Sequence, residues 1–124
     1  MGLSSKLNGG GRKTVRDGVD TKTLTYIKAA ELGLTEPPYP LRLIGFFIKD
    51  GEYGEGVTVI VKDKKDMYGV NLPKRYVEKF KSLTDEEVEG LISGDTGISD
   101  IKVDVKTPKG KTTMIEFCDM DPDE

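Results

Sequence analysis

The chain has 124 residues, enough for one domain with a modest hydrophobic core, and its 19 basic and 22 acidic residues leave a formal net charge of −3. It contains no histidine, which excludes Ser-His-Asp and Cys-His catalysis as well as histidine-ligated metal sites. A single cysteine, Cys118, allows no internal disulfide and fits a reducing cytosol. An enzyme built only from carboxylates, lysines and tyrosines is left as a third alternative. We expect a non-enzymatic binding or structural protein that needs neither a cofactor nor a metal.

Targeting signals are not evident in the sequence. No apolar run approaches the ~18 residues of a membrane-spanning helix. The opening residues, Met1–Lys6, lack the apolar region of a secretory signal. We expect a chain that works in the cytoplasm and does not enter a membrane.

The two ends of the chain differ in charge. Residues 1–22 carry five basic and two acidic residues, whereas residues 116–124 carry five acidic residues and no base. Residues 1–20 have no apolar periodicity, so they bury too little surface to offset the entropy of ordering. We expect a flexible basic arm over 1–20, one domain over 21–118 and an acidic tail over 119–124.

The first half of the domain has the pattern of strands. Thr23–Lys28 alternates as a strand does, and Ala29–Leu34 has room for a brief helical turn. Three prolines within Glu36–Pro40 exclude regular structure there. Leu41–Lys49, rich in Ile and Phe, is the strongest strand, and Gly45 within it permits a bulge.

Two more strands follow after charged turns. Asp50–Gly56 predicts a turn, and Val57–Val61 predicts the returning strand. Asp63–Asp66 is a second charged turn before a short strand over Met67–Leu72.

A helical stretch is predicted from Pro73 to Ile92. Proline suits the first turn of a helix, and Thr84 with Glu87 three residues later forms a capping box that opens a second helix. Gly94 then provides the stop signal. The residues expected to face the core at helical spacing are Tyr76, Val77, Phe80, Val88, Leu91 and Ile92.

Two alternating strands close the domain. Ile101–Lys106 and Thr113–Phe117 are joined by a turn at Thr107–Gly110. Short links between strands favour antiparallel pairing. With Thr23–Lys28 left outside the sheet, five strands with a helical segment between the third and fourth match a mainly β, five-stranded antiparallel OB-like barrel. A flat α+β sheet with its helices on one face is the alternative.

A series of short motifs in order adds a family resemblance over residues 26–118. The motifs are Tyr26–Leu32, Leu43–Ile48, Tyr53–Gly54, Val59–Val61 and Val70–Lys74. Together they resemble small proteins from phages and mobile elements of Gram-positive bacteria that are regarded as single-stranded-DNA-binding proteins with an OB-type fold. The resemblance implies non-enzymatic binding of single-stranded DNA during replication or recombination of such an element, in the cytoplasm of the bacterial host.

Aromatic residues on strands are the first candidates for the site, because bases stack on them whatever the sequence. Phe46 and Phe47 are adjacent and must point to opposite faces of their strand, so one belongs to the core. We expect the other, Phe47, to be available to DNA. Tyr53 lies in a charged turn where burial is unfavourable, and Tyr68 lies in the short third strand.

Basic residues complete the predicted interface. Lys62, Lys64 and Lys65 cluster in one turn, and Arg42 and Lys49 flank the strongest strand. The bases within Lys74–Lys81 are better explained as a solvated helix face. The predicted nucleic-acid-binding residues are thus Arg42, Phe47, Lys49, Tyr53, Lys62, Lys64, Lys65 and Tyr68.

Two alternatives remain open at this point. The acidic tail, Asp119–Glu124, is similar in kind to tails by which bacterial single-strand binders recruit replication or recombination proteins, or else it only solubilises the chain. The net acidity also suits a second function, that of a protein–protein interaction module, an accessory factor or inhibitor, that binds no nucleic acid. A basic and aromatic outer sheet face would favour DNA over this second function.

Overall fold

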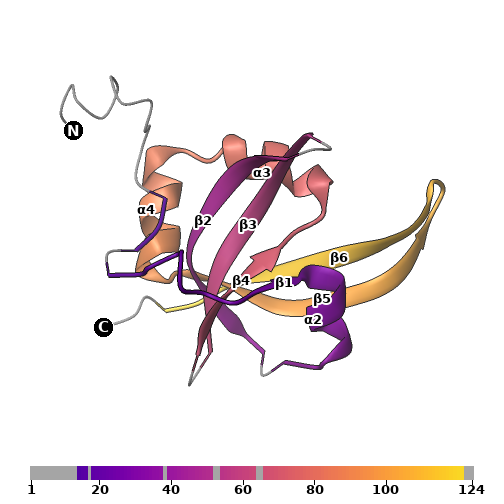
Figure 1. Cartoon of the computed structure of the whole chain (residues 1–124), viewed down its shortest axis with the longest axis horizontal. Coiled ribbons are helices and arrows are strands. Elements are labelled where there is room, and N and C mark those ends of the chain that lie inside the picture. The colour runs from indigo at the N-terminus through magenta and orange to yellow at the C-terminus, as the bar shows by residue number, and fades with distance from the viewer. Residues whose placement is uncertain (1–13, 17, 38, 52–53, 64–65, 122–124) are drawn as a thin grey trace.

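The computed structural model describes residues 14–16, 18–37, 39–51, 54–63 and 66–121. They form a mainly β fold, a six-stranded mixed sheet curled into a half-barrel with short helices around it (Figure 1). In chain order the elements are β1 (Tyr26–Lys28), α2 (Ala29–Leu34), β2 (Leu41–Gly51), β3 (Gly54–Lys62), β4 (Met67–Asn71), the 3₁₀ helix η1 (Lys74–Tyr76), α3 (Val77–Lys81), α4 (Asp85–Ser93), β5 (Thr96–Thr107) and β6 (Gly110–Asp119).

The strand order corrects the predicted topology. The sheet runs β1-β4-β3-β2-β5-β6, and β1 pairs with β4 in parallel while the other pairs are antiparallel. The prediction of a five-stranded antiparallel barrel is therefore wrong in strand number and in one direction. Parallel pairing needs a long crossover, which α2, β2 and β3 provide between β1 and β4. The helical segment between β4 and β5 is where the sequence predicted it.

The second strand bends sharply and connects the two halves of the sheet. It pairs with β3 from Arg42 to Gly51, with a register shift between Leu43 and Gly45 that confirms the predicted bulge. Its pairing with β5 is limited to Leu41 and Arg42. Beyond that contact, β5 and β6 continue as a long hairpin that projects from the half-barrel (Figure 1).

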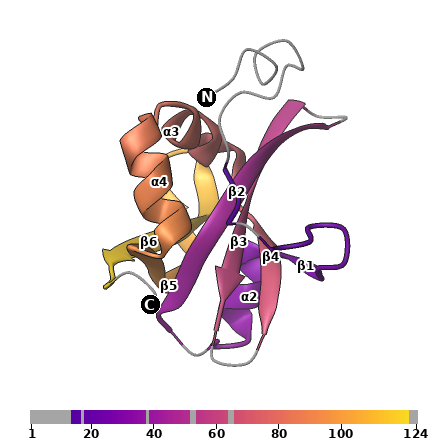
Figure 2. The same cartoon turned by 90° about the vertical axis from the view of Figure 1, so that its left-hand side faces the viewer.

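The core lies on the inner face of the sheet. Leu41, Leu43 and Phe46 of β2 are at most 2% exposed and pack with the alternate valines of β3. Helices α3 and α4 cover this face from one side (Figure 2) and contribute Phe80, Val88 and Leu91. The predicted core positions Tyr76 and Phe80 are confirmed as buried.

Local signals in the sequence set the ends of α4. The Glu87 amide donates to the Thr84 hydroxyl at 3.1 Å, and the Glu87 carboxylate accepts from the Thr84 amide at 2.9 Å. Gly94 ends the helix in the left-handed conformation, with φ of 94°, which costs a glycine little. Both the capping box and the glycine stop are confirmed.

Side chains from η1 bind the outer edge of β6. The Ile115 amide donates to the Tyr76 hydroxyl at 2.9 Å, and Arg75 donates to the Thr113 carbonyl at 2.6 Å. These contacts satisfy backbone groups that an edge strand would otherwise expose. They link the segment after β4 to β6 without a further strand pairing.

Candidate nucleic-acid interface

Register defines a second sheet face, turned away from the core, because residues paired across neighbouring strands share a side. We call it the outer face. Phe46 points inward with Val59, so its neighbour Phe47 points outward with Thr58, as predicted for this pair. The residues of the outer face are Tyr26, Lys28, Arg42, Phe47, Lys49, Thr58, Ile60, Lys62, Met67, Gly69 and Asn71.

The N-terminal segment lies across the middle of this face. Val15 pairs with Gly45 on the edge of β2, and Tyr26 pairs with Gly69 on β4. The described residues between them pass in front of β2 and β3 (Figure 1). Ile60 points outward between the two glycines, yet it is 0% exposed because this segment lies over it.

Glycine is required at both crossing points. A Cβ at Gly45 would lie 2.7 Å from the Val15 Cα, and a Cβ at Gly69 would overlap the Tyr26 ring. Real Cβ atoms do not approach other atoms so closely. Each glycine thus provides the space in which the N-terminal segment meets the sheet.

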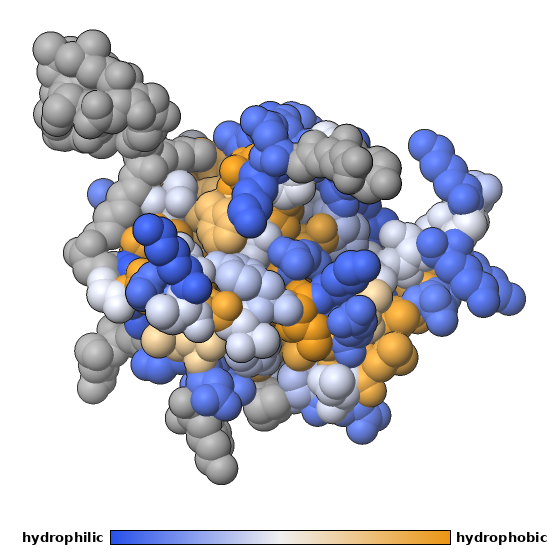
Figure 3. Space-filling view, in the orientation of Figure 1, coloured by the Kyte–Doolittle hydropathy of each residue, from blue (hydrophilic) through white to orange (hydrophobic). Residues whose placement is uncertain are grey.

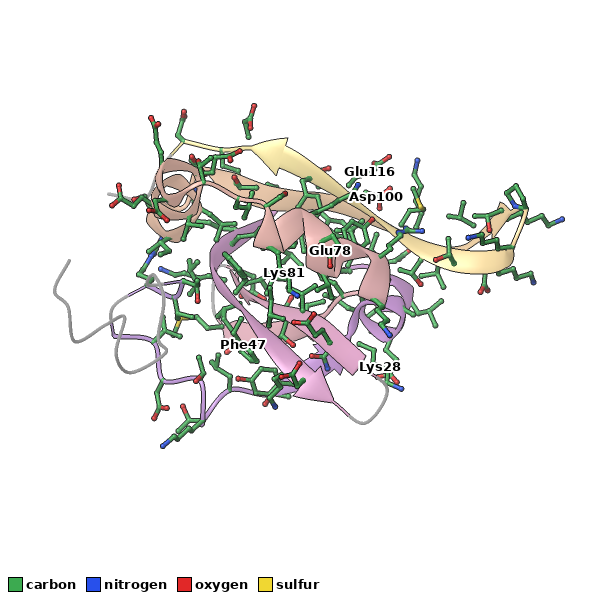
Figure 4. The ribbon with its side chains drawn as sticks, turned by 90° about the horizontal axis from the view of Figure 1, so that it is seen from above. Lys28, Phe47, Glu78, Lys81, Asp100 and Glu116 are labelled. Atoms are coloured by element: carbon green, nitrogen blue, oxygen red, sulfur yellow. The ribbon has the colours of Figure 1, made fainter. Side chains whose placement is uncertain are left out.

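Beyond the crossing, one end of the outer face combines aromatic and basic side chains. We call Tyr26, Lys28, Phe47 and Lys49 the aromatic end. The Tyr26 and Phe47 rings meet edge to face, with centroids 6.1 Å apart, and the Lys49 Nζ lies 5.9 Å from the Phe47 centroid. Tyr26 is 38% exposed and Phe47 is partly exposed. Phe47 and Lys28 lie on the side of the molecule opposite Asp100 and Glu116 (Figure 4).

The surroundings of the aromatic end are polar. The Tyr26 hydroxyl donates to the Thr21 carbonyl at 2.5 Å, which holds the ring in place. Thr58 is the cross-strand partner of Phe47, and its hydroxyl donates to the Asn71 side-chain oxygen at 2.6 Å. Figure 3 looks onto the face crossed by the N-terminal segment and shows hydrophilic side chains with apolar ones between them.

Arg42 and Lys62 lie at the other end of the outer face, paired with each other. The Arg42 guanidinium donates to the Gly94 carbonyl and, at 2.5 Å, to the Asp121 carbonyl. These contacts give Arg42 a structural role, joining β2 to the end of α4 and to the C-terminal residues. Lys62 is exposed.

The remaining predicted site residues do not join this arrangement. Tyr68 pairs with Val61 and packs against the core, so it lies on the inner face, away from Phe47. Burial raises its pKa above the usual value, with further contributions from Asp63, Tyr39 and Asp66. Tyr53, Lys64 and Lys65 lie outside the described residues.

Contacts with the fold extend into both predicted terminal segments. The Arg16 amide donates to the Ile44 carbonyl at 2.9 Å, and the Arg16 Nε donates to the Ile92 carbonyl at 2.8 Å. Asp119 is the last residue of β6, and the Met120 amide donates to the Asp95 carbonyl at 2.7 Å. Within the described residues, the fold therefore holds the chain from Thr14 onward and as far as Asp121.

A second surface feature is a groove on the side of the molecule where α3 and α4 pack. It has a volume of about 340 Å³ and lies between α3, α4 and β6. We call it the helical groove. Its lining is mainly apolar, with polar groups at the rim: Leu43, Tyr76, Lys79, Phe80, Leu83, Glu87, Leu91, Asp95, Thr96 and Phe117.

Metal sites and membrane spans can be assessed in the part of the chain that the structure describes. No group of three or more acidic or cysteine side chains there is placed to hold a metal ion, and no helix there is long and apolar enough to span a membrane. Comparison with protein-family models, curated proteins and solved structures gives no match to this chain. A functional assignment must therefore be argued from the residues and their geometry.

Proposed function

We propose that this protein binds single-stranded DNA without catalysis, through the aromatic end of the outer face. The observation that carries the proposal is the pair of partly exposed rings, Tyr26 and Phe47, with Lys49 beside the Phe47 ring. Lys28 lies in the same cross-strand row as Phe47, with Asn71 and Thr58 between them. An aromatic platform beside basic side chains suits a strand whose bases are unpaired and whose phosphates are close by.

The chemistry of the four residues divides into two parts. Stacking of a base on an exposed ring contributes about 1–3 kcal/mol and does not depend on which base it is. The two ammonium groups supply phosphate contacts that weaken as salt rises. Paired bases in a duplex cannot reach the rings, so the arrangement favours a single strand.

The order of elements adds support for an OB-like fold. Setting β1 and α2 aside, β2, β3, β4, the helical segment, β5 and β6 follow the sequence order of a five-stranded OB barrel, a fold that binds oligonucleotides on its sheet face. The resemblance to phage and mobile-element proteins adds the setting, replication or recombination in a bacterial host cell.

Fluorescence anisotropy with a labelled oligonucleotide of about 15 nucleotides tests the proposal. We expect micromolar or tighter binding at low salt, with a log–log salt slope of about −0.7 for each phosphate contacted. Phe47→Ala should weaken binding by about 1–3 kcal/mol, which is roughly 5- to 150-fold. Phe117→Ala is the matched control, because Phe117 is exposed on β6, away from the outer face, and its loss should leave the affinity unchanged.

Two results would contradict the proposal. One is binding of a duplex of the same length as tightly as the single strand, and the other is no binding of either at low salt. The second result would favour the alternative function, a module that binds another protein. Equal losses from Phe47→Ala and Phe117→Ala would place the binding site elsewhere on the molecule.

A further inference from the structure

The helical groove has no part in the proposed DNA binding, since it lies on the core side of the sheet, against α3 and α4. Its floor is formed by Leu43, Phe80 and Leu91, and Phe117 at its rim remains 38% exposed. The Phe80 and Phe117 rings stand 6.3 Å apart, with their planes at 66°. The groove can therefore bind one or two aliphatic side chains against an apolar lining.

One wall of the groove is strongly acidic. Helix α4 and the residues just after it carry Glu87 and Asp95 at the rim, and no basic residue occurs between positions 85 and 95. Asp85, Glu86 and Glu89 add negative charge on the exposed surface of the same helix. A segment that fills this groove should therefore combine aliphatic side chains with basic ones.

The chain itself carries such a segment. Residues 1–13 contain three basic residues and no acidic one, and Leu3 and Leu7 supply aliphatic side chains four positions apart. This segment is too poor in apolar residues to fold alone, but a segment of that kind becomes ordered when a preformed groove receives it.

The point of attachment places the segment beside the groove. Thr14 accepts a hydrogen bond from the Phe46 amide at 2.9 Å, and Arg16 donates to Ile92 in the last turn of α4. Ile92 directly follows Leu91, a groove residue. Thirteen extended residues reach up to about 43 Å. The nine residues of α4 span only about 14 Å, so the segment is long enough to follow the helix.

We propose that residues 1–13 dock in the helical groove of the same chain, with Leu7 seated between Phe80 and Phe117 and the basic residues facing the acidic wall of α4. Charge complementarity and the position of Thr14 favour this occupant over a segment from another protein. The docked segment covers apolar lining of this groove, and it leaves the outer face untouched.

The absence of tryptophan from the chain gives a clean test. In the full-length Leu7→Trp variant, the only indole reports on the groove. We expect its emission at shorter wavelength than that of a 1–13 peptide with the same change. Adding Phe117→Lys should return the emission to that of the peptide. Leu34→Lys is the matched control, since Leu34 is exposed on α2, and it should leave the shift intact.

Trypsin cleavage after Lys6 provides a second readout without the tryptophan. We expect cleavage in the otherwise unchanged chain to be several-fold slower than in Phe117→Lys and equal to that in Leu34→Lys. Emission like that of the free peptide, or a shift that survives Phe117→Lys, would overturn the proposal. A shift that grows with protein concentration would assign the groove to a second copy's segment and also overturn it. None of these outcomes bears on DNA affinity, which tests the proposed function separately.

Discussion

Phe46 and Phe47 are neighbours of the same residue type with different surroundings. Phe46 is 2% exposed and lies 5.0 Å from the Phe80 ring in the core. Phe47 is partly exposed and meets Tyr26 and Lys49 on the outer face. The alternation of a strand thus assigns one phenylalanine to folding and the other to the surface.

The same division extends over the whole of the sheet formed by β2, β3 and β4. Its inner face is an uninterrupted apolar layer, and its outer face mixes aromatic, basic and glycine residues. Substitutions on the two faces should therefore change different quantities. Inner-face changes should lower the free energy of unfolding, whereas outer-face changes should lower DNA affinity.

The largest effect is expected for Phe46→Ala. Loss of a fully buried phenylalanine ring leaves a cavity and should lower the free energy of unfolding by about 3–5 kcal/mol. For Phe47→Ala the loss should be near the ~0.5–1.5 kcal/mol of an aromatic pair contact. Urea unfolding followed by circular dichroism measures both, and equal losses for the two variants would contradict the division between faces.

The second prediction concerns Gly69, the residue of β4 over which the Tyr26 ring lies. A Cβ at this position would overlap the Tyr26 ring, so Gly69→Ala should displace Tyr26 from Phe47. We expect the affinity for single-stranded DNA to fall by about as much as one lost stacking contact, roughly 1–3 kcal/mol. Gly56→Ala is the control on the same face: Gly56 of β3 pairs with Lys49, and a Cβ there meets no atom within 4 Å. It adds a methyl group without displacing a ring, so its effect on affinity should be much smaller. Unchanged affinity in Gly69→Ala would show that the position of Tyr26 does not matter for binding.

Local sequence signals predicted most of the elements correctly. The capping box at Thr84, the stop at Gly94 and the bulge at Gly45 each depend on a few adjacent residues, and all are confirmed. The strand pattern of Thr23–Lys28 was recognised, but this strand was left out of the five-stranded sheet, because its parallel pairing with β4 depends on a contact distant in sequence. No local pattern around Tyr26 indicates that Gly69 will be its partner.

The same limit applies to the candidate site. The sequence predicted Phe47 and Lys49 as site residues of one strand, and the register shows that they share a face. Alternation could not show that Tyr68 faces inward or that Arg42 holds backbone carbonyls, since both depend on tertiary packing. Tyr26 and Lys28 were missed as site residues because only the fold brings Tyr26 against Phe47 and places Lys28 in the same cross-strand row.

The third prediction compares two exposed lysines. Lys49 lies beside Phe47, whereas Lys81 on α3, which is labelled in Figure 4, forms an ion pair with Glu55. Lys49→Ala should weaken DNA binding at low salt and reduce the magnitude of the log–log salt slope by about 0.7, the value for one phosphate contact. Lys81→Ala should change neither. Anisotropy titrations at several salt concentrations give both quantities, and equal changes in the two slopes would mean that attraction by overall charge dominates.

The smallest effect is expected for Tyr68→Phe, which tests whether a change on the inner face leaves DNA affinity unchanged. Tyr68 was a predicted DNA contact, but its ring packs against the core, so removal of the hydroxyl should leave DNA affinity unchanged. The hydroxyl should affect the free energy of unfolding only at alkaline pH. Burial raises the pKa of Tyr68 in the folded protein above the unfolded value of about 10. Its contribution to stability is thus fully present below about pH 10 and is lost as the pH rises through the folded pKa.

Urea unfolding of Tyr68→Phe and the unchanged protein between about pH 9 and pH 11 measures this effect. The variant should lose less stability over that range, because it has one fewer tyrosine that ionises more readily in the unfolded chain. Tyr39 retains its own raised pKa in both proteins, so the variant should still lose some stability. A fall in DNA affinity at neutral pH, with the alkaline loss of stability unchanged, would instead show that the Tyr68 hydroxyl contacts DNA.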